Sequence, residues 1–276
     1  MTRKHPKRCL QVAFNIALIV GLVTALSYLP PDTSLADRQK AGTLKLCVPP
    51  SYPPLVTNDP ERPGFDIELA RAIADKLNLR LAVNVLPSIG KDFNPRNWSL
   101  TRAQCDIVAG GVADTEQTRG YLQTLTTGVE TGWVGISATT ILPPTGSTIL
   151  VLPGTSGLNR VALSTWLRQQ GLRGQPAQSA DQLLRALDSG SAAVAITERF
   201  VAGTLDPEAH GYRVFWLPQE AFPRMSMALA LWKGDQTLRR AVGTVIQDLQ
   251  ANGALEELRR RYDLEIAPTV LTNHEL

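Results

Sequence analysis

Histidine and the short motifs of enzyme active sites are scarce in this sequence. Its three histidines, His5, His210 and His274, lie far apart in the chain, so we expect neither a histidine base nor a metal cluster. The chain contains no phosphate-binding loop, no pair of Cys-x-x-Cys motifs and no Gly-x-Ser-x-Gly turn, which mark nucleotide, zinc and hydrolase sites. These absences favour non-catalytic binding without a cofactor or a metal ion.

An excess of positive charge is also missing from most of the chain. The net charge of +3 arises in residues 1–36, which hold four basic residues and one acidic residue. The whole chain has 28 basic and 25 acidic residues, so the part after residue 36 has 24 of each and is formally neutral. We therefore expect no nucleic-acid partner, because no basic surface remains to neutralise phosphates. The composition, with 43% hydrophobic and 19% charged residues, is that of a folded globular protein.

The first 36 residues have the order of a targeting segment. A basic stretch ends at Arg8, and an apolar run from Leu10 to Leu29 follows it, as in a secretory signal. Ser34-Leu35-Ala36 and Val23-Thr24-Ala25 are two candidate cleavage sites. The run is also long enough to span a bilayer, so a cleaved signal peptide and a retained membrane anchor both stay open. Either one places the remaining chain outside the cytoplasm, and we expect a periplasmic protein.

The sequence has only three cysteines. Cys9 lies at the start of the apolar run, while Cys47 and Cys105 fall in the exported part. Disulfides persist in oxidising compartments, so Cys47 and Cys105 are a possible disulfide. Two separate buried thiols are the alternative.

The pattern of apolar residues predicts an α/β fold. A strand is expected at Thr43–Val48, a helix over residues 64–78 and a strand at Leu79–Leu86. A short buried run, Asp106–Ala109, ends in Gly110-Gly111. Strands alternating with helices build parallel sheets covered by helices.

The same order recurs in the second half of the chain. A strand is expected at Ser147–Leu152, and residues 154–157 would open a helix after it. A further helix is expected from Ser179, with Gln182 completing a capping box, followed by a buried strand at Ala192–Ile196. The chain then predicts a strand at Met227–Trp232 and two more helices, the first capped by Asp235.

Several of these segments resemble the amino-acid-type extracellular solute-binding proteins of ABC importers, over residues 42–264. The segments that carry the resemblance are Gly42–Leu46, Tyr52–Leu55, Gly64–Ala70, Cys105–Gly111, Gly154–Ser156, Gly190–Glu198, Ala230–Asp235 and Asn252–Leu255.

The resemblance implies two Rossmann-like lobes joined by two crossing strands, the type II fold of periplasmic binding proteins. Lobe one would comprise residues 37–131 plus 226–276, and lobe two residues 138–221. The crossovers would lie near residues 132–137 and 222–227. The lobes would close on a ligand as a hinged clamp.

The resemblance also implies which residues touch the ligand. Arg119 would bind a carboxylate, although it stands one residue later than the family pattern, and a surface charge is the alternative. Thr155 and Ser156, at a strand-to-helix turn, would bind an anion or simply cap the helix. Glu198 would receive an ammonium group where the family usually has aspartate, or face the following helix dipole.

Three further residues complete the implied site. Tyr52 would stack on the ligand or pack within its loop, and Gly110 and Gly111 would allow close backbone approach or only a tight turn. The aromatic pair that the family has before the first crossover is replaced here by residues 127–132. This departure bears on which ligand is bound.

The sequence predicts a monomer that captures a small zwitterionic ligand and delivers it to an ABC permease. Two alternatives stay open. Residues 90–98, with Cys47 and Cys105, resemble relatives found beside periplasmic quinoprotein dehydrogenases. An accessory or sensory protein is therefore one alternative, and a long uncleaved anchor would favour it. Other relatives are cyclohexadienyl dehydratases, in which Glu198 or Glu130 would serve as the acid.

Overall fold

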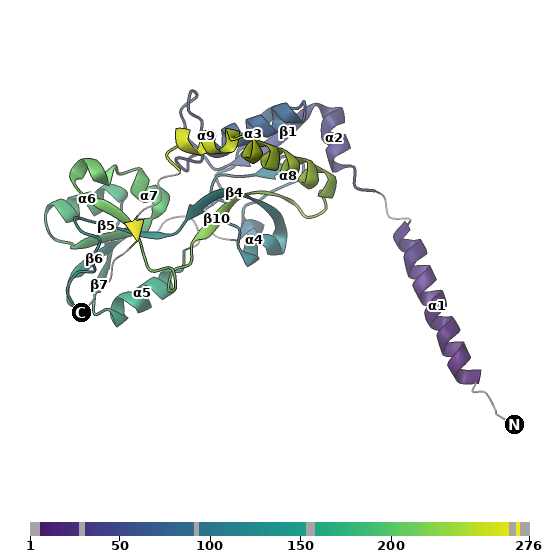
Figure 1. Cartoon of the computed structure of the whole chain (residues 1–276), viewed down its shortest axis with the longest axis horizontal. Coiled ribbons are helices and arrows are strands. Elements are labelled where there is room, and N and C mark those ends of the chain that lie inside the picture. Colours follow the sequence, from purple (N-terminus) through teal and green to yellow (C-terminus); the bar gives the residue numbers. More distant parts are fainter. Residues whose placement is uncertain (1–5, 28–30, 91–93, 153–157, 265–268, 271–276) are drawn as a thin grey trace. The chain divides into compact units, whose positions relative to one another are not determined.

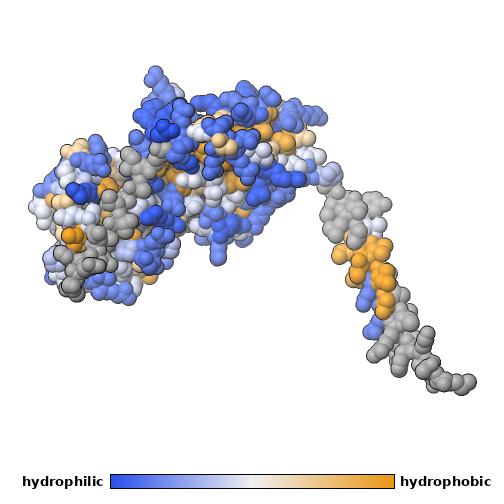
Figure 2. Space-filling view, viewed as in Figure 1, coloured by the Kyte–Doolittle hydropathy of each residue, from blue (hydrophilic) through white to orange (hydrophobic). Residues whose placement is uncertain are grey.

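The computed structural model describes residues 6–27, 31–90, 94–152, 158–264 and 269–270. The chain divides into two compact units, Met1–Thr33 and Ser34–Leu276. The first unit contains helix α1 (Pro6–Ser27). Its large exposed apolar side chains are coloured orange in Figure 2 and are Val12, Phe14, Ile16, Leu18, Ile19, Val20 and Leu22. Within the described residues, no helix combines the length and apolar character that crossing a membrane requires.

The second unit contains two mixed sheets, and the first has the strand order β2-β1-β3-β10-β4. Its strands are β1 (Thr43–Val48), β2 (Arg80–Val85), β3 (Ile107–Val108), β4 (Leu122–Thr131) and β10 (Met225–Trp232). Strand β1 runs parallel to β2 and β3, whereas β10 runs antiparallel to β3 and β4. A strand from late in the chain therefore lies between two early ones.

The helices of this part are α2 (Ser34–Ala41), α3 (Phe65–Lys76), α4 (Glu116–Tyr121), α8 (Gln236–Ala251) and α9 (Ala254–Arg261), with a 3-10 turn η1 (Pro95–Asn97). Helices α3, α8 and α9 pack together (Figure 1). In α3, the predicted apolar face is observed, because Leu69, Ala70 and Ile73 are fully buried. Burial of this face holds α3 on the sheet.

The second sheet has the order β11-β9-β5-β8-β6-β7. Its strands are β5 (Trp133–Ser137), β6 (Thr148–Val151), β7 (Arg173–Pro176), β8 (Val194–Glu198), β9 (Arg213–Trp216) and β11 (Thr269–Val270). Its helices are α5 (Arg160–Gln169), α6 (Ala180–Asp188) and α7 (Arg199–Gly203), with a 3-10 turn η2 (Pro207–His210). Strand β6 is parallel to β7 and β8, while β5 is antiparallel to β8 and β9.

We use lobe one for the part built on the first sheet and lobe two for the part built on the second. The chain leaves the first sheet at Thr131 and enters the second at Trp133. It returns between Trp216 and Met225. The predicted lobe limits stay a prediction. One strand differs from them, because β11 lies in the tail that was expected in lobe one and pairs with β9 of the second sheet.

Two predicted helix caps are wrong. Ser179 is the N-cap residue of α6, but its side chain makes no capping bond, and Gln182 instead accepts a hydrogen bond from the Gln178 N–H at 2.7 Å. Asp235 is the N-cap residue of α8 and likewise makes no capping bond. Its carboxylate forms an ion pair with Arg102 instead. The ion pair and a helix cap compete for the same carboxylate oxygens. Residues 154–157, which were predicted to open a helix, lie outside the described residues.

Cys47 and Cys105 form a disulfide, with their Cα atoms 5.4 Å apart. It joins β1 to the residue two before β3, its parallel neighbour. Both cysteines are fully buried in a cluster with Trp98, Val112 and Leu122. The bond therefore fixes the centre of the first sheet.

Replacing both cysteines, Cys47→Ala with Cys105→Ala, should lower the free energy of unfolding by about 2–4 kcal/mol, because the unfolded chain gains the freedom that the cross-link removes. Urea unfolding measures the loss, and Cys9→Ala serves as the control that leaves it unchanged. Equal stability of the double variant and the parent would contradict the disulfide's role.

Candidate functional site

A buried carboxylate lies where the two lobes meet. Glu198 ends β8 of lobe two and is fully buried. Its Oε1 accepts a hydrogen bond from the Tyr52 hydroxyl at 2.8 Å and another from the Thr131 hydroxyl. Tyr52 follows β1 and Thr131 ends β4, both in lobe one. One carboxylate oxygen of lobe two is thus held by two groups of lobe one.

The loop after β1 fixes the Tyr52 side chain. The Tyr52 backbone N–H donates to the Val56 carbonyl at 2.8 Å, and the Val56 N–H donates to the Tyr52 carbonyl at 3.0 Å. The Tyr52 ring also meets Phe200 of α7 edge to face, with centroids 5.7 Å apart. Aromatic pairs favour this geometry. Contacts from both lobes therefore fix the phenol ring, and its hydroxyl points to Glu198.

The two predicted glycines lie beside this phenol. Gly110 and Gly111 both have positive φ values, of 76° and 104°, which a side chain disfavours. An added Cβ at Gly111 would lie 3.3 Å from the Tyr52 ring. A cavity of about 150 Å³ is lined by Pro49, Pro50, Ser51, Tyr52, Ile89, Gly90, Gly110 and Gly111.

A second buried carboxylate supports the glycine turn. Asp66, in the first turn of α3, is 2% exposed. Its Oδ2 accepts the Gly110 N–H at 2.7 Å. Burial raises the pKa of Asp66 from 3.8 to about 7, and the Gly110 hydrogen bond opposes this rise. Asp66 was not among the predicted site residues, although its Gly-Phe-Asp motif marked the start of the helix.

Arg119 does not join this cluster. It lies on α4, its side chain is half exposed, and its guanidinium pairs with the Asp114 carboxylate at 2.9 Å. Its Nη1 also donates to the Asp114 carbonyl at 3.3 Å. The structure thus brings together Tyr52, Gly110, Gly111 and Glu198 of the predicted set. Thr155 and Ser156 lie outside the described residues.

Thr131 is the contact that sequence reasoning missed. Its hydroxyl is fully buried and donates to Glu198. Its position directly before the crossover was the available signal, since residues there lie near both lobes. Within the described residues, no group of three or more histidine, cysteine, aspartate or glutamate side chains could hold a metal ion.

Residues 44–265 match the model of the bacterial extracellular solute-binding proteins, family 3. This match spans most of the chain and includes every residue of the site described above. The chain belongs to this family. No curated protein sequence matches the family 3 chain.

Solved structures share the fold of this family 3 chain. An ancestral cationic amino acid solute-binding protein, AncCDT-1, has 19% identity and a TM-score of 0.65, covering 83% of this chain and 99% of its own. Another structure of AncCDT-1, described as a precursor of cyclohexadienyl dehydratase, has 17% identity, a TM-score of 0.55, and covers 83% and 98%. A histidine-bound ABC transporter protein from Streptococcus pneumoniae has 17% identity and a TM-score of 0.57, covering 84% and 96%.

The raised pKa of Asp66 predicts a pH-dependent stability. Between pH 4 and 7 the folded protein keeps a proton on Asp66 that the unfolded chain has lost, so its contribution falls as the pH rises and is lost above about pH 7. Asp66→Asn should flatten this slope, which reaches at most about 1.4 kcal/mol per pH unit. Urea unfolding at a series of pH values tests it, and parallel curves for variant and parent would contradict it.

Gly110→Ala should destabilise the protein by about 1–3 kcal/mol. The new Cβ would lie 2.5 Å from Pro49 Cδ and 2.6 Å from Val56 Cγ2, at a positive φ. Gly190→Ala is the matched control, because Gly190 has a φ of 68° and, apart from its chain neighbours, no described residue has an atom within 4 Å of an added Cβ. Thermal unfolding should show a larger loss for Gly110→Ala, and equal losses would mean that the packing at Gly110 is unimportant.

Proposed function

We propose that this family 3 protein captures a small zwitterionic ligand, an amino acid, between its lobes and delivers it to an ABC permease. The observation that supports the proposal is the Glu198 carboxylate, fully buried and bonded to lobe one. Ionic attraction is stronger in a buried site than in water, so a ligand ammonium group is the natural partner for this carboxylate.

Tyr52 gives the site its link between ligand binding and lobe closure. The phenol donates to Glu198 across the lobes, so the orientation of the acid depends on the position of lobe one. In the proposed complex, the ligand ammonium group binds Glu198 while the Tyr52 ring covers the ligand. Ligand binding would then favour the arrangement in which both lobes contact Glu198.

The ligand carboxylate has a separate set of proposed partners. Arg119 would bind it bidentately after exchanging its ion pair with Asp114. Thr155 and Ser156 would contribute hydroxyl and backbone N–H donors at the predicted strand-to-helix turn. We propose these roles on the resemblance of the sequence to the family, together with the lobe limits at residues 37–131 plus 226–276 and 138–221.

The names of two neighbours support an amino acid as the ligand. AncCDT-1 is described as a cationic amino acid solute-binding protein, and the Streptococcus pneumoniae protein contains histidine. We extend this chemistry to the present chain, with a monomeric protein in the periplasm and a signal peptide or membrane anchor within residues 1–36.

Thermal unfolding of the full chain in the presence of single amino acids tests the function. A ligand at about 100 times its dissociation constant should stabilise the protein by about 2.7 kcal/mol. Glu198→Gln should weaken binding of that amino acid by about tenfold or more, since the ammonium loses its charged partner. Glu220→Gln, at an exposed position, is the control and should bind normally.

Two outcomes would contradict this assignment. If no zwitterion raises the unfolding temperature of the parent protein, an amino acid is the wrong ligand class. If an amino acid binds equally well to Glu198→Gln and to the parent, Glu198 is not its ammonium site.

A dehydratase is the second candidate, because one neighbour is described as a precursor of cyclohexadienyl dehydratase and Glu198 is a buried acid. Turnover of prephenate by the purified protein, abolished in Glu198→Gln, would establish that activity. Binding of an amino acid without turnover would support the transport role. An accessory or sensory role would keep the same ligand site without a permease, and co-purification with a permease separates the two.

A further inference from the structure

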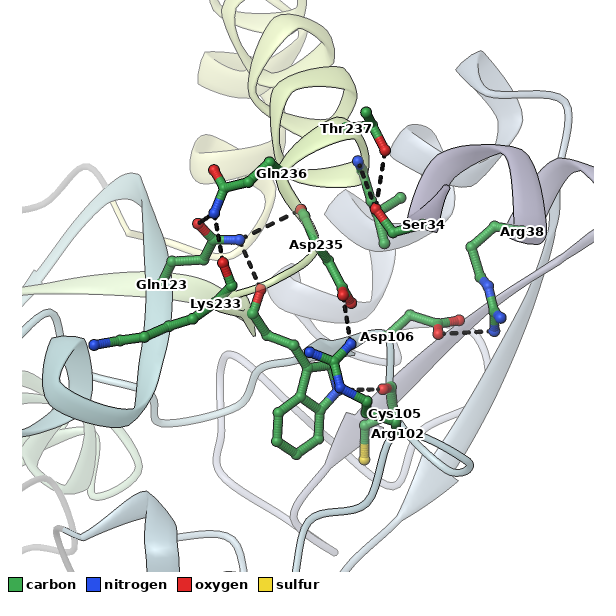
Figure 3. Close-up of polar contacts among 12 residues, drawn as sticks. Ser34, Arg38, Arg102, Cys105, Asp106, Gln123, Lys233, Asp235, Gln236 and Thr237 are labelled. Atoms are coloured by element: carbon green, nitrogen blue, oxygen red, sulfur yellow. Dashed lines mark hydrogen bonds and ion pairs between the residues drawn. The ribbon is translucent and has the colours of Figure 1, made fainter. Parts of the chain in front are cut away.

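Helix α8 lacks a cap from its own N-cap residue. The Asp235 side chain makes no capping bond and pairs instead with Arg102, as Figure 3 shows. The first turn of a helix has backbone N–H groups without partners inside the helix, and an N-cap oxygen normally accepts one from the second or third residue. In α8 the third residue is Leu238.

Ser34 supplies the missing cap from the other end of the chain. Its Oγ accepts the Leu238 N–H at 3.2 Å, across 204 residues of sequence. It also lies 3.0 Å from the Thr237 hydroxyl (Figure 3). Ser34 is the first residue of α2, so an oxygen from one helix start caps another helix.

The capping is reciprocal. The Thr237 hydroxyl accepts the Leu35 N–H, in the first turn of α2, at 3.2 Å. Each helix therefore supplies a hydroxyl to the N-terminal N–H groups of the other. We call Ser34, Leu35, Thr237 and Leu238 the reciprocal cap.

Two contacts hold α2 in place beside the reciprocal cap. The partly buried Leu35 packs against the core of lobe one. Arg38 pairs with Asp106 at 3.0 Å (Figure 3), and Asp106 in turn accepts the Lys45 N–H of β1 at 2.8 Å. Helix α2 is thus part of the folded unit that begins at Ser34.

This placement bears on the candidate cleavage site at Ser34-Leu35-Ala36. A cut after Ala36 would remove Ser34 and Leu35, and with them the cap of α8 and an apolar contact of the core. The second candidate, Val23-Thr24-Ala25, lies upstream of every residue of the reciprocal cap. Cleavage there would leave the folded unit whole.

We infer that the mature protein keeps Ser34, because its hydroxyl is the N-terminal cap of α8, and that any removal of the targeting segment occurs upstream of it. The inference is independent of which ligand the clamp binds.

Intact-mass measurement of the protein recovered from an exporting bacterial cell tests the position of the mature N-terminus. A mass that corresponds to the full chain, or to a cut anywhere before Ser34, is the expected result. A mature chain that begins at Asp37 would overturn the inference.

A double-mutant cycle in the full chain tests the cap itself. Ser34→Ala should lower the unfolding temperature by about 2–4 °C. Ser34→Ala and Thr237→Ala together should cost less than the sum of the two single losses, since the hydroxyls act as a pair. Ser179→Ala is the matched control, because Ser179 is also an N-cap residue but makes no capping bond, and it should have little effect. Additive losses, or equal losses for Ser34→Ala and Ser179→Ala, would refute the reciprocal cap.

Discussion

The arrangement of the candidate site depends on one buried carboxylate. Glu198 stands at the end of a fully buried strand, where an isolated charge is costly. Its environment must therefore supply polar partners, and lobe one supplies two of them through Tyr52 and Thr131. Residues of lobe one thus donate the hydrogen bonds that stabilise a buried side chain of lobe two. This makes the contact between the lobes specific.

The neighbouring glycine turn also depends on a hydrogen bond to a buried acidic side chain. Gly110 is held by a hydrogen bond to Asp66, itself buried. The turn packs so closely on Pro49 and Val56 that a methyl group has no room. Gly110 and Gly111 thus line part of the small cavity beside Tyr52 with backbone atoms, and the Asp66 side chain holds the Gly110 backbone in place.

The sequence predicts the local helices and strands around the site well, because these elements depend on residues that are neighbours in the chain. The apolar spacing of α3 and the short buried strand that leads to Glu198 are visible as patterns of a few residues, and the observed elements β1 and α3 lie within two residues of those expected. The ligand-binding roles predicted for Glu198 and Tyr52 came from the family resemblance rather than from the pattern itself, and they stay predictions. Their direct bond was not predicted, since 146 residues separate them.

The failures share a physical cause. Asp235 has a side chain suited to cap α8, yet its carboxylate accepts a hydrogen bond from Arg102, which is 133 residues away in the sequence. Arg119 pairs with Asp114 in this structure, and its contact with a ligand stays a prediction. Propensity describes what a residue does among its sequence neighbours, and tertiary competition for the same atoms decides the outcome.

The place of β10 in the first sheet has a consequence for the order in which the protein assembles. This strand lies between β3 and β4, yet it is made only after all of the sheet of lobe two except the edge strand β11. A chain emerging from a ribosome or a translocon can therefore pair β5, β6, β7, β8 and β9 while the first sheet still has a gap between β3 and β4. Closing that gap requires contacts between distant residues, which form slowly. The first sheet, which begins earlier along the chain, therefore stays incomplete until strands β5 to β9 of the second sheet have been made.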